Sequence, residues 1–341
     1  MYKLIPPLIL LNALIFILCL SLGPSSVGFY DVIEVINGKA DTNTESIILA
    51  YRMPRIIISM LVGSALATAG CAMQALFRNP LADPYVLGVS SGASVGAAIV
   101  ILIGIATTLN TMLAAFVFSL LTAFIVYKLG ETKIGLPVYT LLLAGVAMAS
   151  FLSGVTSLLI YLAGKEMHQI VFWIMGGFWT AQWEKVWFVF VPIVGSIVYV
   201  LLNSWNLNAI LMGEEHALSV GIDVESFKKK IIAASSLLTS SSVAVSGIIG
   251  FVGIVIPHAM RLIVGENHRT LIPTTILFGA AFMPLVDLIA RTATESEIPV
   301  GIITALLGAP FFIYLLRSCL LYTSDAADEG LGVDLGGRRI I

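Results

Sequence analysis

The sequence predicts an all-α integral membrane protein, a polytopic bundle of about ten transmembrane helices with both termini in the cytoplasm. Of its 341 residues, 58% are hydrophobic and only 11% are charged. Soluble domains carry about 25% charged residues, and the mean hydropathy of this chain is +1.00. Long apolar stretches recur along the chain, and basic residues concentrate in alternate connections between them. These observations place the chain in the lipid bilayer.

The candidate spans follow from the length of each apolar stretch. A helix needs about 20 mostly apolar residues to cross a hydrocarbon core about 30 Å thick. The eighth candidate is short and contains Pro257, His258 and Arg261, so we expect a broken helix that neighbouring protein shields from lipid. Residues 170–183 carry a Gly-Gly pair and tryptophans, which are typical of an interfacial helix or a re-entrant turn. The ten spans are 4–22, 54–77, 85–105, 110–129, 137–162, 186–202, 231–248, 249–265, 271–290 and 299–316.

The basic residues predict the orientation of the chain. If Lys3 is cytoplasmic, alternation of the spans places ten basic residues inside and six outside, in the direction of the positive-inside rule. The inside set is Lys3, Arg78, Lys128, Lys133, Lys228, Lys229, Lys230, Arg261, Arg269 and Arg317. The outside set is Lys39, Arg52, Arg55, Lys165, Lys185 and Arg291.

The end of the chain differs in character from the rest. Residues 1–318 form a single transmembrane domain in this interpretation, with one long cytoplasmic connection at 207–228. From about residue 319 the sequence has four acids, several glycines and no apolar period. We expect residues 319–341 to be either an artefact of foreign or misread sequence or a disordered tail.

The chain carries no signature of its own catalytic chemistry. A subunit that hydrolyses ATP would need G-x-x-x-x-G-K-[ST], and neither Gly38-Lys39 nor Gly164-Lys165 lies in that pattern. Intramembrane proteolysis is disfavoured because Asp287 is the only aspartate well inside a span. The scattered cysteines and histidines have no metal-ligand spacing. We therefore expect no catalytic residue, no bound metal and no directly bound cofactor, and the net charge of −2 disfavours nucleic acid as a partner.

Three arginines are predicted to lie at the outer mouth. Arg52 and Arg55 are three residues apart and share one face at the start of a helix. Arg291 ends the ninth span on the same side, where a cation suits a helix C-terminus. The three could dock acidic residues of a partner through bidentate pairs. Composition alone favours the alternative, in which they are anchors that reach the membrane interface.

The cytoplasmic connection at 207–230 has a helical pattern of its own. Leu211, Ala217, Leu218 and Val220 could form an apolar patch, with glycines before and after it as start and stop signals. Such an element suits contact with a partner. A solvated loop that ends in a basic run is an equally good interpretation.

A second polar segment, QALFRNPLADPYVLGVSSGAS at 74–94, separates two spans. We expect it to form a rigid cytoplasmic corner in which Pro80 and Pro84 end and restart helices. Arg78 supplies inward positive charge, and Asn79 and Asp83 can cap the exposed helix ends.

Small residues recur at helical spacing in two of the spans. They favour close helix packing over direct contact with a ligand. The residues are Gly63, Ala67, Gly70, Gly88, Gly92 and Gly96.

Seven motifs together resemble one family of membrane permeases. They are RMPR at 52–55, the 74–94 segment, LLLAGVA at 141–147, IMGGF at 174–178, GEEHALSVGI at 213–222, GFVGIVIPHAMR at 250–261 and EIPVGIITALLGAPFFIYLL at 297–316. In this order they resemble the FecCD family, the permeases of ABC importers for iron-siderophores, haem and vitamin B12.

The resemblance implies a type II importer in the plasma or inner membrane of a prokaryote. Its expected partners are a second permease subunit, two ATPase subunits that use ATP, and an extracytoplasmic substrate-binding protein. The resemblance implies that Arg52, Arg55 and Arg291 receive glutamates of the binding protein. It further implies that the segment that couples to the ATPase contains Gly213, Glu214, Glu215, Ala217, Leu218 and Gly221.

The alternative function is a secondary transporter driven by an ion gradient. Such a protein is expected to carry intramembrane carboxylates as ion or proton sites. This chain offers only Asp287 near the end of a span. A scaffolding membrane protein would leave the ordered motifs unexplained.

Overall fold

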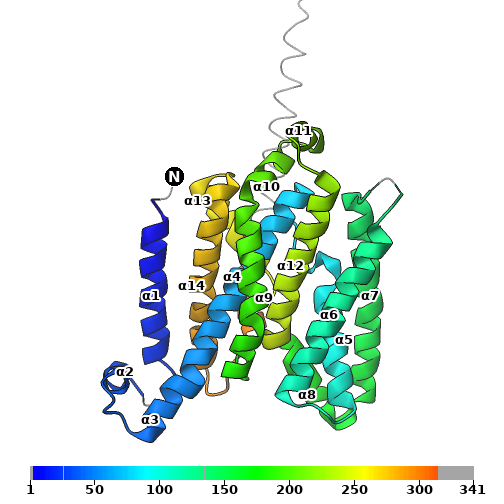
Figure 1. Cartoon of the computed structure of the whole chain (residues 1–341). Helices are drawn as coiled ribbons and strands as arrows, with labels where there is room; N and C mark the ends of the chain where they lie inside the picture. The colour runs from blue at the N-terminus through cyan, green and yellow to red at the C-terminus, as the bar shows by residue number, and fades with distance from the viewer. Residues whose placement is uncertain (1–2, 26, 134, 314–341) are drawn as a thin grey trace, which may run out of the picture.

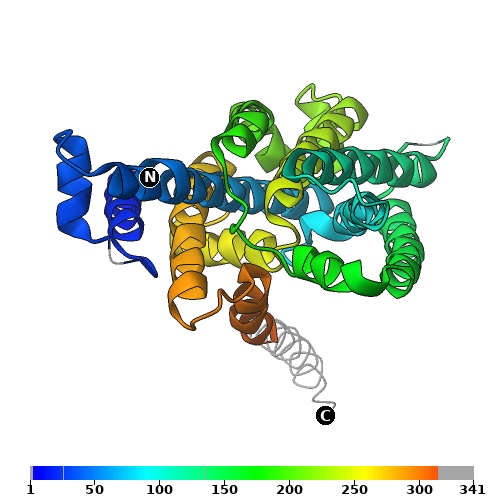
Figure 2. The same cartoon turned by 90° about the horizontal axis from the view of Figure 1, so that it is seen from below.

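Helices packed around one central helix make up the chain (Figures 1 and 2). The computed structural model describes residues 3–25, 27–133 and 135–313. In Figure 1, α1 (Ile5–Ser21) lies at one side of the bundle and α7 (Val138–Leu162) at the other, with α4 (Met53–Phe77) between them. The all-α polytopic fold class is thereby confirmed.

Each of the ten predicted spans coincides with a helix. Within the described residues, five helices are long and apolar enough to cross a membrane, among them α4 and α7, and four shorter apolar helices accompany them. The predicted spans that remain to be named are α5 (Val89–Leu102), α6 (Thr108–Gly130), α9 (Trp183–Leu202), α12 (Val224–Ser246), α13 (Val252–Val264), α14 (His268–Thr292) and an unlabelled helix, Val300–Ile313.

Short helices at the ends of the bundle complete the chain. The sequence-based spans did not include α2 (Phe29–Ile36), α3 (Thr42–Ser46) or the π-helix η1 (Ile47–Arg52), which lie between α1 and α4. The sequence does contain an N-cap for α3, because the Asp41 carboxylate accepts hydrogen bonds from two backbone N–H groups of the first turn. The other short elements are η2 (Pro84–Leu87), η3 (Gly164–Glu166), α8 (Met167–Met175), α10 (Ser204–Leu211) and α11 (Glu214–Ser219).

The central helix α4 is buried along most of its length and packs against α9, α12, α13 and α14. Its glycines allow backbones to touch. A Cβ added at Gly63 would lie 2.1 Å from the carbonyl oxygen of Gly279 in α14, and one at Gly70 would lie 1.8 Å from that of Gly253 in α13. The small residues therefore serve helix packing, as the sequence predicted.

The eighth span is short, as expected, but the expected break within it is wrong, because α13 runs through Pro257, His258 and Arg261 as one helix and the interruption of the chain precedes it. After α12 ends at Ser246, the chain turns through Gly247 and through Phe251, which has a φ of 67° in the left-handed region, before α13 begins. The carbonyl of Ser246 accepts a hydrogen bond from the N–H of Gly177, at 2.7 Å, in the turn after α8. A backbone N–H from the turn after α8 thus satisfies a carbonyl oxygen at the point where the chain leaves α12. Residues 170–183 form the end of α8 and this turn, which matches the predicted short helix.

The bundle has two ends in Figure 1, one at α10 and α11 and the other at α2, α3 and α8. The start of α1 lies at the α11 end. Which end faces the cytoplasm remains a prediction from the basic residues. Arg317 and the expected artefact or tail at 319–341 lie outside the described residues.

The contact between α4 and α14 provides a test of the core. We expect Gly63→Leu to destabilise the protein by about 1–3 kcal/mol, because the side chain would have to push apart two touching backbones. Thermal unfolding in detergent measures the effect. Gly154→Leu in α7 is the matched control, since a Cβ at Gly154 meets no atom within 4 Å. Equal melting temperatures for the two variants would contradict this account of the packing.

Candidate functional site

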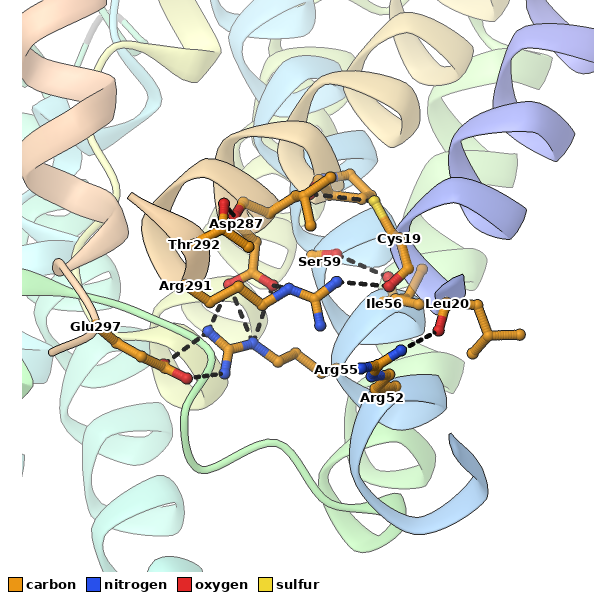
Figure 3. A network of polar contacts seen from close by, with 12 residues as sticks. Cys19, Leu20, Arg52, Arg55, Ile56, Ser59, Asp287, Arg291, Thr292 and Glu297 are labelled. Atoms are coloured by element: carbon orange, nitrogen blue, oxygen red, sulfur yellow. Dashed lines mark hydrogen bonds and ion pairs between the residues drawn. The ribbon is translucent and has the colours of Figure 1, made fainter. Parts of the chain in front are cut away.

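Five charged side chains gather at the end of the bundle that contains α2 and α3 (Figure 3). Arg52 ends η1, Arg55 lies in the first turn of α4, Asp287 and Arg291 lie near the end of α14, and Glu297 lies in the following loop. We call these five residues the arginine cluster. The fold therefore brings together the three arginines that the sequence predicted to act as one group.

Arg55 is the centre of the arginine cluster. Its Nε and Nη2 donate to the two carboxylate oxygens of Asp287 at 2.9 and 2.8 Å, and its Nη1 and Nη2 donate to Glu297 at 2.9 Å each. Such two-point pairs are the strong form of the arginine–carboxylate contact. The Asp287 side chain is only 2% exposed and that of Arg55 12% exposed, so the charges neutralise each other inside the protein.

The other two arginines hold the end of α1. Arg52 donates from Nη1 to the carbonyl oxygen of Leu20 at 2.6 Å, and Arg291 donates from Nη2 to that of Cys19 at 2.6 Å. These carbonyls lie in the last turn of α1, where a helix has no internal donors to offer. Cations also suit the negative end of the helix dipole. Arg52 and Arg291 thus cap α1 and fix it to α4 and α14.

The geometry bears on the docking hypothesis without testing it. All three arginines and Glu297 line a pocket of about 370 Å³. The arginine cluster keeps one positive charge in excess, and Nε of Arg291 has no hydrogen-bond partner among the described residues. An acidic partner could use the excess charge, although each arginine already has contacts within the chain and Nε of Arg291 is itself buried, 3.9 Å from Asp287. Docking therefore stays a prediction, and so does the alternative in which the arginines anchor the membrane interface, because the low exposure of Arg52 and Arg291, 4% each, bears on both in the same way.

Sequence reasoning missed the acidic half of the arginine cluster. Asp287 precedes Arg291 by four residues in one helix, a spacing that indicates a shared face. Glu297 gives no such signal, because it lies in a loop and reaches Arg55 across 242 positions of the sequence. Only the tertiary fold brings it there.

At the opposite end of the bundle, α10 and α11 form the predicted cytoplasmic element. Gly213 and Gly221 flank α11 with φ values of 131° and 87°, in the region that glycine adopts without strain. These two glycines start and stop the helix, as predicted. Glu214 binds Nζ of Lys228 in α12 at 2.8 Å, and this ion pair ties α11 to the bundle.

The apolar patch on this element differs from the predicted one. Ala217 is fully buried against the bundle, and Leu211 is partly buried. Leu218 is 59% exposed and Val220 43%, and Met212, which the prediction omitted, is 77% exposed. The difference arises because α11 is only six residues long and packs on the bundle through the face that carries Ala217. We call Met212, Leu218 and Val220 the α11 patch.

The corner between α4 and α5 is partly as predicted. Arg78 ends α4 in the left-handed conformation with a φ of 48°, and its Nε donates to the carbonyl oxygen of Ile210 at the end of α10. Its charge therefore caps a neighbouring helix. Asn79 does not cap a helix, because its Oδ1 accepts from the N–H of Leu81 and forms a turn. Pro80 is exposed beside it, three residues after α4 ends.

The second half of the corner, from Asp83 onward, packs into the bundle. Asp83 accepts the N–H of Tyr85 at 2.8 Å and caps η2, as predicted, and burial raises the pKa of its carboxyl to about 6. Pro84 begins η2 and is buried, and the hydroxyl of Tyr85 donates to the carbonyl oxygen of Ile249. Only Arg78, Asn79 and Pro80 are left as exposed surface for a partner.

Known permeases have sequences related to this chain. The chain is 44% identical over 272 residues to the cobalamin import system permease protein BtuC of Halobacterium salinarum, a match that covers 80% of this chain and 73% of that one. It is 36% identical over 328 residues to the molybdate import system permease protein MolB of Haemophilus influenzae, covering 92% and 96%.

The structural comparison agrees with the sequences. The fold superposes on a solved structure described as an inward-facing metal-chelate type ABC transporter with a TM-score of 0.83 and 34% identity, covering 93% of this chain and 99% of that one. The model of the FecCD transport family matches residues 10–318. The chain therefore belongs to the FecCD transport family.

Proposed function

We propose that this protein is the permease subunit of an ABC importer that carries a metal chelate, such as an iron-siderophore, haem or cobalamin, into the cytoplasm. The observation that carries the proposal is the family match over residues 10–318. The relative that imports cobalamin and the metal-chelate transporter with the same fold support the substrate class. The proposed location is the plasma or inner membrane of a prokaryote.

The proposed mechanism involves no covalent chemistry in this chain. The permease alternates between outward and inward openings, and closure of ATPase subunits on ATP biases which opening is populated. The chain itself binds no cofactor in this proposal, and ATP is used by the partner. Two permease subunits, two ATPase subunits and an extracytoplasmic binding protein make up the proposed assembly.

The two ends of the bundle suit different partners. At one end, the exposed apolar side chains of the α11 patch fit a groove on an ATPase. At the other end, the excess positive charge of the arginine cluster fits the carboxylates of a binding protein. Between them, α7 exposes Leu143, Val146 and Phe151, which suit lipid or a second permease subunit.

Ion-gradient transport has little support from the geometry. Asp287, near the end of α14, is the one aspartate within a predicted span, and Arg55 binds it through two hydrogen bonds shorter than 3 Å. A carboxylate that exchanges protons or sodium ions needs to be free to do so. Asp287 is instead held as a permanent partner of the guanidinium.

The proposed ATPase contact predicts the effect of a charge in the α11 patch. We expect Leu218→Asp to abolish ATP-coupled uptake, because a carboxylate would enter an apolar groove of the ATPase. Uptake into vesicles and co-purification of the ATPase measure the loss. Leu218→Met keeps the apolar contact and is the control. The assignment is wrong if the Asp variant transports at the wild-type rate.

The proposed docking contact predicts the effect of removing one arginine. Arg52 is the best choice because its partners are neutral, so Arg52→Gln leaves no buried carboxylate unpaired. We expect docking of the binding protein to weaken by about tenfold or more in low salt, since a charged contact is lost. Surface plasmon resonance measures the affinity.

Lys39→Gln is the matched control for this variant, because it removes an exposed positive charge from the connection between α2 and α3, outside the arginine cluster. A melting curve of Arg52→Gln checks that α1 stays in place. If Arg52→Gln binds the binding protein with the wild-type affinity in low salt, the arginine cluster is not part of the interface.

A further inference from the structure

A cavity of about 520 Å³ lies at the same end of the bundle as the arginine cluster, between α8 and the start of α9. The ends of α5, α6 and α12 close its other sides, and only Trp179 also lines the pocket of the arginine cluster. Neither the docking nor the coupling hypothesis uses this cavity. Its polar lining includes Thr107, Thr111, Lys165, His168, Thr180 and Lys185.

Lys185 is the unusual member of this lining. It lies in the first turn of α9 and is only 6% exposed. Its ammonium donates to the hydroxyl of Thr180 at 2.6 Å and to the carbonyl oxygen of Val245 at 3.4 Å. An ammonium has three donors, so one is left over. No carboxylate among residues 3–313, apart from the two internal positions that the structure does not describe, forms an ion pair with it.

The surroundings of Lys185 disfavour an unpaired positive charge. Burial removes water from the ammonium, and both of its hydrogen-bond partners are neutral. The first turn of a long helix is the positive end of its dipole, which adds repulsion. The lining contains no Asp or Glu, and its other titratable groups, Lys165 and His168, are exposed basic residues. An anion in the cavity would relieve all of these effects.

The walls of the cavity indicate the size and kind of anion. Phe172, Trp173 and Trp179 also line the cavity and are its aromatic wall, and the rings of Phe172 and Trp179 meet edge to face with centroids 5.6 Å apart. Pockets for small molecules have volumes of about 300–1,000 Å³ and mostly apolar walls. A small inorganic oxyanion would leave most of this space and the aromatic wall unused. A larger organic acid with a flat apolar part fits both features.

We propose that this cavity is a binding subsite for a carboxylate-bearing organic chelator, with Lys185 as its counter-ion and the aromatic wall as the surface for its apolar part. The proposal rests on the importer function and narrows the substrate to an acidic chelate. Thr180 positions the ammonium through its hydroxyl. Lys165 and His168 add positive charge at the rim.

A matched pair of small probes tests the subsite on the full chain in nanodiscs of zwitterionic lipid. The probes are 2,3-dihydroxybenzoate and its uncharged amide, 2,3-dihydroxybenzamide, and calorimetric titration gives both affinities. We expect the acid to bind about tenfold or more tightly than the amide, because only the acid pairs with the buried ammonium. Equal affinities in the wild-type protein would overturn the proposal without any variant.

Variants then locate the preference at one residue. Lys185→Met should abolish the preference for the acid, and Lys185→Arg should keep most of it. Lys165→Met removes a charge from the exposed rim and should keep it as well. A preference that survives in Lys185→Met would overturn the proposal. Circular dichroism and a melting curve establish that each variant is folded.

Molybdate forms a third arm, since one relative is a molybdate permease. Molybdate binding that depends on Lys185, with no binding of the acid, would overturn the assignment to an organic chelator. The importer function is tested separately by co-purification with the ATPase and ATP-driven uptake. If the acid does not bind but uptake of cobalamin is intact, only the subsite is wrong. If the chain does not assemble with an ATPase, the proposed function is wrong.

Discussion

The close approach of α4 to its neighbours is the constraint on which the rest of the structure depends. Lipid gives helices no hydrophobic reason to associate, so van der Waals contact between backbones has to supply much of the attraction. Gly63 against Gly279 and Gly70 against Gly253 provide that contact along one helix. Because α4 lies against both α13 and α14, its position sets the spacing of the bundle and places the first turn of α4 beside the last turns of α14.

That placement explains how charges can exist at the edge of the apolar bundle. Arg55 and Asp287 meet because the first turn of α4 lies beside the last turns of α14, and Glu297 accepts hydrogen bonds from both terminal nitrogens of the guanidinium. The other two arginines use their donors on the end of α1. A buried ion pair is weak evidence of stability in itself, but loss of one partner leaves a costly unpaired charge. The arginine cluster is therefore a joint between α1, α4 and α14. In the proposed transporter it is also the surface on which a binding protein would dock.

The chain places its other polar groups at two separate ends for different purposes. At the α11 end, glycines with positive φ values create a short helix that exposes Leu218 and ties Glu214 to Lys228. At the arginine end, Lys185 lies in a cavity with no carboxylate partner among the described residues. In the arginine cluster two carboxylates offset most of the positive charge, which suits a joint between helices. The ammonium of Lys185 in the cavity has no carboxylate partner among the described residues, which suits a ligand subsite.

The sequence by itself determined the fold class, the positions of ten helices, the glycine limits of α11 and the cap at Asp83, because each depends on local composition or on neighbours within a few residues. The motifs in order also determined the family. Only the tertiary structure decided which side chains meet. Glu297 reaches Arg55, Arg52 and Arg291 reach carbonyls of α1, and Ala217 turns inward while Met212 turns outward. These contacts join residues far apart in the chain or depend on which face of a short helix touches the bundle, and neither property is encoded in local periodicity.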